Sequence, residues 1–142
     1  MSDAVVHVVD DDADARDSLA FLLEAADYQV ATYGDALAFL DALPDAAPGC
    51  VITDVRMPGM SGQELVKRLK AQGSALPVVM ITGHGDIPMA VEAMRDGVVD
   101  FIEKPFSDAR ILAELERALA SAASAPTQPV VSEDRKSTRL NS

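Results

Sequence analysis

The sequence VVHVVDDD, residues 5–12, passes from an apolar, β-branched run directly into three consecutive aspartates. A short run that is apolar at nearly every position is typical of a strand in a parallel sheet that is covered on both faces. Carboxylates about 4 Å apart repel each other by roughly 4 kcal/mol at an effective dielectric constant near 20, so these acids either spread into water or are neutralised by a cation. On this stretch alone solvated acids are the simpler interpretation, because Asp is common in loops and at helix N-caps.

Similar apolar runs recur along the chain and alternate with helical patterns. The further runs are at residues 30–33, 51–53, 78–81 and 98–102. Between and after them, apolar residues repeat every three or four positions, as in an amphipathic helix: around residues 19–26, 36–43, 65–69, 90–94 and 111–119. Five strands alternating with five helices predict an α/β fold, namely a doubly wound parallel sheet with helices on both faces. Two strand orders are common for such sheets at this size, and we expect the flavodoxin-like (βα)5 order 2-1-3-4-5.

Length and composition limit the class of protein. The 142 residues fit one domain, which we place at residues 1–122, and 49% hydrophobic residues are enough for a core. A net charge of −11 argues against nucleic-acid binding by this chain alone. Cys50 is the only cysteine, which excludes a disulfide framework. No stretch predicts a signal peptide or a membrane span, so we expect a cytoplasmic protein without a membrane partner.

Five side chains with complementary chemistry follow the predicted strands. Because the carboxyl ends of parallel strands meet at one edge of the sheet, we expect them to converge there: Asp10, Asp11, Asp54, Thr82 and Lys104. Carboxylate oxygens around an open position suit Mg²⁺, which would relieve the repulsion between the acids. An Asp carboxylate can also accept a phosphoryl group, whose charge a metal and a lysine neutralise. Each residue alone has an ordinary surface role, but five at these strand ends favour a site.

The set VVDDD, DVRMPGMSG, ITGHG and DFIEKPF resembles the receiver domain of two-component response regulators over residues 1 to about 122. The resemblance implies that Asp54 is the phosphorylation site. It implies that Asp10, Asp11 and Asp54, with the backbone carbonyl of Arg56, bind Mg²⁺. It also implies that Lys104 contacts the phosphate. The extra acid of the triplet, Asp12, is assigned to helix capping.

The resemblance also implies a conformational switch. Thr82 would contact the phosphate, and the ring of Phe101 would turn into the space that the hydroxyl leaves. The signalling surface would then be the face made by the fourth helix, the fifth strand and the fifth helix. Pro105, which follows Lys104, is a candidate for a cis peptide bond. The implied partners are a sensor histidine kinase and, after phosphorylation, a second copy of the chain.

The segments GHGDIPMAVEAM and DFIEKPF are most similar to the FixJ-type subgroup, whose members carry a LuxR-type DNA-binding domain after a linker. Residues 123–133 are rich in Ala, Ser and Pro, which predicts a linker. The closing DRKSTRLNS, residues 134–142, matches the translation of a common sequencing adapter, so we expect a non-native tail and a chain truncated before its output domain. An ordinary disordered tail is the alternative.

Three other functions remain as alternatives. A phosphatase of the haloacid dehalogenase type also uses an Asp nucleophile and Mg²⁺, but it needs a second Asp where this chain has Arg56. A receiver that acts alone through protein contacts differs only in lacking an output domain. A flavin-binding relative is disfavoured, because the first loop is acidic where a phosphate needs amides and glycines. In the leading interpretation the chain is not an enzyme in the usual sense, because it catalyses only its own phosphorylation and dephosphorylation.

Overall fold

The computed structural model, which describes residues 4–43 and 49–124, contains a five-stranded sheet in the order β2-β1-β3-β4-β5. All the strand pairs are parallel, and the strands are β1 (Val5–Val9), β2 (Gln29–Tyr33), β3 (Gly49–Asp54), β4 (Val78–Thr82) and β5 (Asp100–Glu103). The helices are α1 (Ala13–Ala25), α2 (Ala36–Ala42), α3 (Gly62–Ala71), the short 3-10 helix η2 (His84–Asp86), α4 (Ile87–Arg95) and α5 (Asp108–Ser124). The predicted fold class and strand order are confirmed.

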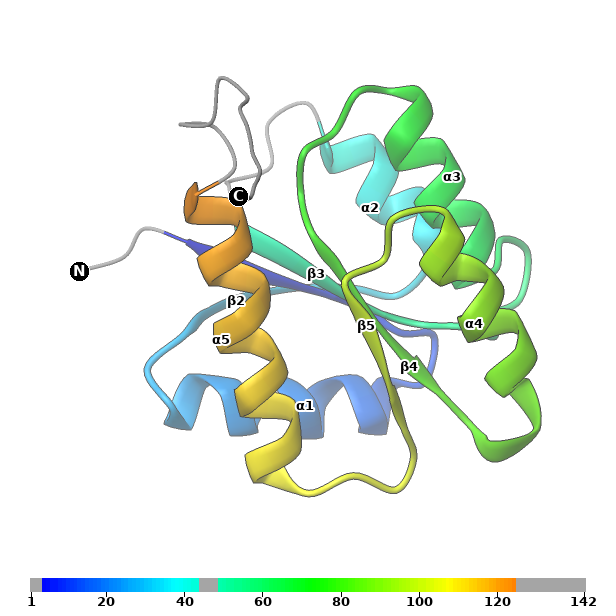
Figure 1. The fold of residues 1–142 in the computed structure, drawn as a ribbon. Coiled ribbons are helices and arrows are strands. Elements are labelled where there is room, and N and C mark those ends of the chain that lie inside the picture. Colours follow the sequence, from blue (N-terminus) through cyan, green and yellow to red (C-terminus); the bar gives the residue numbers. More distant parts are fainter. Residues whose placement is uncertain (1–3, 44–48, 125–142) are drawn as a thin grey trace, which may run out of the picture.

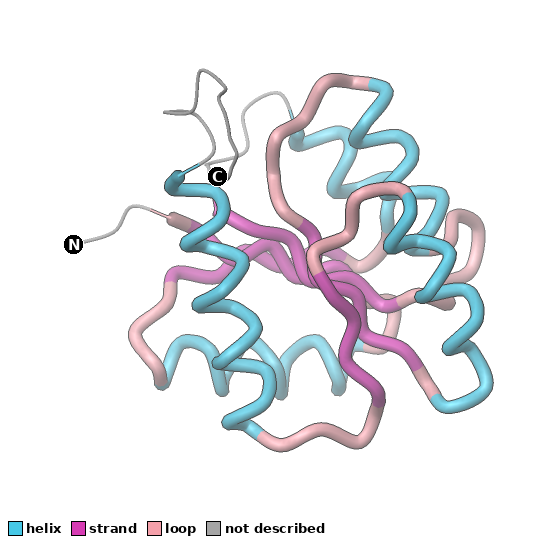
Figure 2. Tube along the Cα trace, in the orientation of Figure 1, coloured by secondary structure: helices cyan, strands magenta, loops and turns pink. Residues whose placement is uncertain are grey.

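Helices cover both faces of the sheet, and each face has its own apolar core (Figures 1 and 2). On one face α2, α3 and α4 pack over residues that include Val51 and Met80, both fully buried. On the other face α1 and α5 pack over residues that include Ile52 and Ile81. Successive residues of one strand therefore serve opposite cores, which is why the strands are apolar at nearly every position.

Short polar side chains begin the helices. Asp12, Asp35 and Ser61 accept hydrogen bonds from backbone N–H groups in the first turns of α1, α2 and α3. The Ser107 hydroxyl does the same for Arg110 in α5, with a distance of 3.1 Å between Oγ and the backbone nitrogen. These bonds satisfy backbone donors that have no partner within the helix. The assignment of Asp12 to helix capping is confirmed.

The fifth strand begins later than its apolar run predicts. Val98 is 5% exposed and packs against the core of the α2–α4 face, although it lies in the turn after α4. The backbone N–H of Val99 donates to the carbonyl of Val78, and regular pairing of β5 starts only at Asp100. The apolar run marks residues that are buried, whether or not they pair in the sheet, and here the buried segment begins at Val98, two residues before β5.

A cluster of four charged side chains ties α5 to the edge strand β5. Glu114 is 2% exposed and pairs with both Arg110 and Arg117. Arg117 also lies 3.2 Å from the Asp100 carboxylate, which accepts the backbone N–H of Phe101. Burial works to raise the pKa of Asp100, but this hydrogen bond and the neighbouring guanidinium groups lower it below its usual value. Asp100 therefore stabilises the fold above that usual pKa and loses the contribution as the pH falls.

Replacing the buried acid of this cluster should destabilise the domain. We expect Glu114→Gln to lower the free energy of unfolding by about 1–3 kcal/mol, less than for a fully buried pair because both guanidinium groups reach solvent. Glu116→Gln is the matched control on the exposed face of the same helix and should stay within about 0.5 kcal/mol of the wild type. Urea unfolding measures both, and equal midpoints would contradict a structural role of the Glu114 carboxylate.

Some predicted segments fall at the limits of the described residues. Helix α5 continues to Ser124, so it includes the first two residues of the predicted linker. The rest of that linker and the predicted tail, residues 134–142, lie outside the described residues. Within the described part of the chain, no helix combines the length and the apolar character that crossing a membrane requires.

Candidate functional site

Asp54 lies at the carboxyl end of β3, a central strand of the sheet, and its side chain is 11% exposed. One carboxylate oxygen, Oδ2, accepts a hydrogen bond from Lys104 Nζ at 3.1 Å. The other, Oδ1, faces the backbone N–H of Arg56 at 3.4 Å. The carboxylate thus has an ammonium on one side and a backbone donor of the following loop on the other.

The ends of β1 and β3 bring three carboxylates together. Oxygen atoms of Asp10, Asp11 and Asp54 lie within 4.8 Å of one another. Asp10 is 7% exposed, and its Oδ1 accepts the backbone N–H of Asp12 at 2.9 Å. Because β1 and β3 are paired neighbours, their carboxyl ends place these acids side by side.

The electrostatics of this acidic cluster favour a cation. Burial raises the pKa of Asp10, and the charges of Asp54 and Asp11 raise it further, against the Asp12 hydrogen bond and Lys104. Lys104 supplies one positive charge opposite three carboxylates. The donors are all oxygens, which suits a hard divalent ion such as Mg²⁺. The residues present therefore fit a divalent metal site.

The raised pKa of Asp10 gives a stability prediction for the metal-free protein. Asp10→Asn keeps the acceptor for Asp12 N–H but removes a charge, so we expect it to stabilise the fold at pH 7 by about 1 kcal/mol, or roughly 4 °C in Tm. A raised pKa means that ionisation of Asp10 lowers the stability as the pH rises. The difference between variant and wild type should therefore close as the pH falls through that pKa towards the ordinary value. Thermal unfolding in a chelator measures it, and an unchanged or lower Tm at pH 7 would contradict it.

Thr82 and Lys104 reach the same edge of the sheet from the ends of β4 and β5. Thr82 is fully buried, and its Oγ1 donates to the carbonyl of Gly83 at 3.0 Å. The backbone N–H of Lys104 donates to the carbonyl of Thr82, which joins the two strand ends. Its ammonium extends to Asp54, and the Lys104–Pro105 peptide bond is cis.

Phe101 lies within β5, where it pairs with Met80 in the register of β4. It is half-buried and packs against the core on the face that α2, α3 and α4 cover. Glu103 faces Thr82 in the same register, so Phe101 lies two residues before the partner of Thr82. The structure therefore places the two predicted switch residues on adjacent strands of the sheet.

Three residues near the site were not singled out from the sequence. Arg16 of α1 donates from its guanidinium to the backbone carbonyl of Asp10 at 2.6 Å, and so supports the loop that carries the acids. Asp86 pairs with Arg56 at 2.5 Å. Gly62 begins α3 against the backbone of Asp54, where an added Cβ would lie 2.2 Å from the carbonyl oxygen. Of these three residues, only Gly62 could have been found from the sequence, because it lies in the motif DVRMPGMSG directly before an amphipathic helix.

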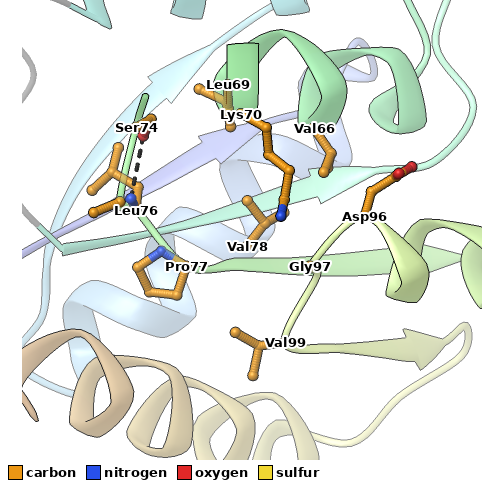
Figure 3. A pocket seen from close by; sticks show the side chains of 11 residues that line it. Val66, Leu69, Lys70, Ser74, Leu76, Pro77, Val78, Asp96, Gly97 and Val99 are labelled. Carbon is orange, nitrogen blue, oxygen red and sulfur yellow. Dashed lines mark hydrogen bonds between the residues drawn. The ribbon is translucent and has the colours of Figure 1, made fainter. Parts of the chain in front are cut away.

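The structure also has an open pocket of about 230 Å³ at the opposite end of the sheet, between the end of α3 and the turn after α4 (Figure 3). Val78, the first residue of β4, and Val99, which directly precedes β5, form part of its wall, with Lys70 and Asp96 at its polar side. Asp54 and the other acids of the site lie at the carboxyl ends of the strands. This pocket is therefore separate from the predicted site.

Comparisons with known proteins identify the family to which this fold belongs. Residues 6–116 match the response regulator receiver domain family. The chain is 54% identical over 129 residues to the transcriptional regulatory protein FixJ of Bradyrhizobium diazoefficiens, covering 91% of this chain and 63% of that protein. It is 53% identical over 118 residues to the protein of the same name from Azorhizobium caulinodans, covering 83% and 56%. The chain thus spans about three fifths of the length of these curated relatives.

Solved structures give the same result. Full-length FixJ of B. japonicum superposes with a TM-score of 0.84 at 54% identity, over 89% of this chain and 62% of that one. The structure named FixJ-N superposes with a TM-score of 0.82 at 50% identity, over 84% and 96%. Fold, strand order and sequence similarity lead to one conclusion: the chain belongs to the response regulator receiver domain family, with FixJ among its close relatives.

Proposed function

We propose that this chain is the phospho-accepting receiver module of a two-component signalling system and that Asp54 accepts the phosphoryl group. The observation that carries the proposal is the position of the Asp54 carboxylate. It lies between the ammonium of Lys104, at 3.1 Å, and the carboxylates of Asp10 and Asp11, within 4.8 Å. A carboxylate nucleophile beside a cation and a cluster of metal-binding oxygens is the arrangement that aspartyl phosphate formation requires.

In the proposed reaction an oxygen of Asp54 attacks the phosphorus of a phosphohistidine on a sensor histidine kinase. The bond between phosphorus and the imidazole nitrogen breaks, its electron pair stays on the nitrogen, and an acyl phosphate forms on Asp54. The Lys104 ammonium offsets the charge of the phosphoryl oxygens, and the Thr82 hydroxyl donates to one of them in place of Gly83. Phosphorylation and its hydrolytic reversal are the only catalysis we propose, and we propose no enzymatic activity on other substrates.

The proposed metal ligands are Asp10, Asp11, Asp54 and the backbone carbonyl of Arg56. Mg²⁺ bound there would neutralise charge on the transferred phosphoryl group. The chain's own part is to hold the carboxylates in place, and two contacts support that function. Arg16 donates to the Asp10 carbonyl, and the Asp12 N–H donates to the Asp10 carboxylate.

The proposed output is a change of surface. When Thr82 turns towards the phosphoryl group, the ring of Phe101 would move inward and alter the face made by α4, β5 and α5. This face would then form a homodimer and control a transcription output domain. The names of the FixJ relatives as transcriptional regulatory proteins support this part of the proposal. We place the module at residues 1–122, in the cytoplasm, and without nucleic acid or membrane as a direct partner.

Intact-mass spectrometry tests the phosphorylation. The purified chain is incubated with acetyl phosphate as the small-molecule donor, once with Mg²⁺ and once with a chelator. We expect a single phosphoryl adduct that forms with Mg²⁺ and is lost on incubation at alkaline pH, where acyl phosphates hydrolyse. An adduct that resists such treatment, or no adduct under either condition, would contradict the proposal.

A further inference from the structure

An ion pair joins the loop after Asp54 to the start of α4. Arg56 lies two residues after Asp54, and Asp86 is the last residue of η2, directly before α4. Arg56 Nε lies 3.2 Å from both carboxylate oxygens of Asp86, and Nη2 lies 2.5 Å from Oδ1. Two donors therefore engage one carboxylate, across the space between the β3–α3 and β4–α4 loops.

The side chains of Arg56 and Asp86 differ in their exposure to solvent. The Asp86 side chain is 17% exposed, whereas that of Arg56 is 70% exposed. The hydrogen bond from Arg56 lowers the pKa of Asp86, and the charge of Lys104 adds to this. The backbone N–H of Arg56 faces Asp54 Oδ1 at 3.4 Å, so this long side chain starts beside the proposed phosphorylation site. Its guanidinium is largely exposed to solvent, and Asp86 holds it on the side of α4.

Building on the function proposed above, we propose that Asp86 is a positioning residue that keeps the Arg56 guanidinium away from Asp54 until a phosphoryl group competes for it. A phosphoryl group carries about −1.5 to −2 charges at pH 7 and three acceptor oxygens, against one charge on Asp86. Guanidinium groups bind such oxygens in a paired geometry. When the Arg56 guanidinium moves from Asp86 to the phosphoryl group, the ion pair between the β3–α3 loop and the start of α4 breaks.

This exchange would link the occupancy of Asp54 to the segment that leads into α4. Asp86 belongs to η2, which follows Thr82 and Gly83 directly, so releasing its carboxylate frees the loop that holds the Thr82 hydroxyl through Gly83. Because coupling is reciprocal, an Arg56–Asp86 ion pair that phosphorylation breaks must also oppose phosphorylation. A substitution of Asp86 that weakens its ion pair with Arg56 should therefore stabilise the state in which Arg56 contacts the phosphoryl group.

Phosphoryl lifetime tests the inference in a double-mutant cycle. The phosphorylated wild type, Asp86→Asn, Arg56→Gln and the double variant are freed of acetyl phosphate, and the adduct is followed by intact mass. We expect Asp86→Asn to lengthen the half-life by about two- to fivefold, the range that an exposed ion pair can supply, because Arg56 then shields the phosphorus from water. In the Arg56→Gln background the same substitution should change the half-life by less than about 1.5-fold.

The cycle separates the possible failures. An equal effect of Asp86→Asn in both backgrounds would mean that Asp86 acts through its own charge, which overturns the inference. No effect in either background overturns it as well. If the wild type forms no adduct at all, the proposed phosphorylation itself has failed. Asp86→Glu keeps the charge and should restore most of the wild-type lifetime.

A second measurement does not depend on lifetime. The side-chain Nε–H resonance of Arg56, assigned by its loss in Arg56→Gln, is recorded by ¹⁵N NMR before and after addition of Mg²⁺ with beryllium fluoride, a phosphoryl mimic. We expect this resonance to shift when the mimic binds. In Asp86→Asn its chemical shift should already differ from that of the wild type before the mimic is added. The matched control is Arg68, whose Nε lies 3.2 Å from Glu64 on the exposed surface of α3 and should not shift. An Arg56 resonance that stays in place while Asp54 binds the mimic would overturn the inference.

Discussion

Asp54→Asn should abolish the Mg²⁺-dependent phosphoryl adduct. The Asn amide keeps an oxygen that can face the Arg56 N–H, but it is not a nucleophile towards phosphorus and carries no charge for Lys104. We expect labelling to fall below detection, a loss of at least about 10³-fold in rate, as when a nucleophile is removed. Intact mass after incubation with acetyl phosphate is the measurement.

The control for this variant is an exposed acid that lies next to the acidic cluster in the sequence. Asp12 caps α1 through its carboxylate, and Asn is an equally good N-cap, so Asp12→Asn should fold normally and keep the adduct. If Asp54→Asn is labelled at the wild-type rate, another residue accepts the phosphoryl group. If Asp12→Asn also loses labelling, the effect of the first variant no longer identifies Asp54.

Gly62→Ala should damage both stability and phosphorylation, although residue 62 carries no reactive group. An added Cβ would lie 2.2 Å from the carbonyl oxygen of Asp54 and 3.1 Å from Val55 Cα, and both are backbone atoms. The Gly62 N–H also donates to the Val55 carbonyl at 2.9 Å, so α3 cannot move away without losing a hydrogen bond. We expect a loss of about 3 kcal/mol in the free energy of unfolding.

Because the displaced atoms belong to Asp54 itself, labelling of folded Gly62→Ala should also slow by at least about tenfold, as expected when a reacting group is misplaced by a fraction of an ångström. Urea unfolding gives the stability, and the initial rate of adduct formation gives the second effect. Gly85→Ala is the control for stability, because nothing lies within 4 Å of its added Cβ. Wild-type stability in Gly62→Ala would mean that α3 does not begin against the backbone of Asp54.

Much of the fold follows from local patterns. The strand over residues 5–9 ends where the three aspartates begin, as its apolar run predicts, and the turn chemistry of Asp12 starts the next helix. The alternation of short apolar strands with amphipathic helices leaves few topologies, because crossovers in parallel sheets are right-handed. The start of β5 differed most from its apolar run, since Val98 is buried and Val99 half-buried without being part of the strand.

The sequence by itself determined that Asp10, Asp11, Asp54, Thr82 and Lys104 stand where strands end, and parallel topology alone brings strand ends to one edge. The tertiary structure decided which atoms meet there. Lys104 reaches Asp54 from another strand, Asp86 takes the guanidinium of Arg56, and Gly62 lets α3 approach the Asp54 carbonyl. Periodicity reports which face of an element is buried. Contacts between distant residues depend instead on the paths of loops and the rotamers of long side chains, which packing of the whole chain sets.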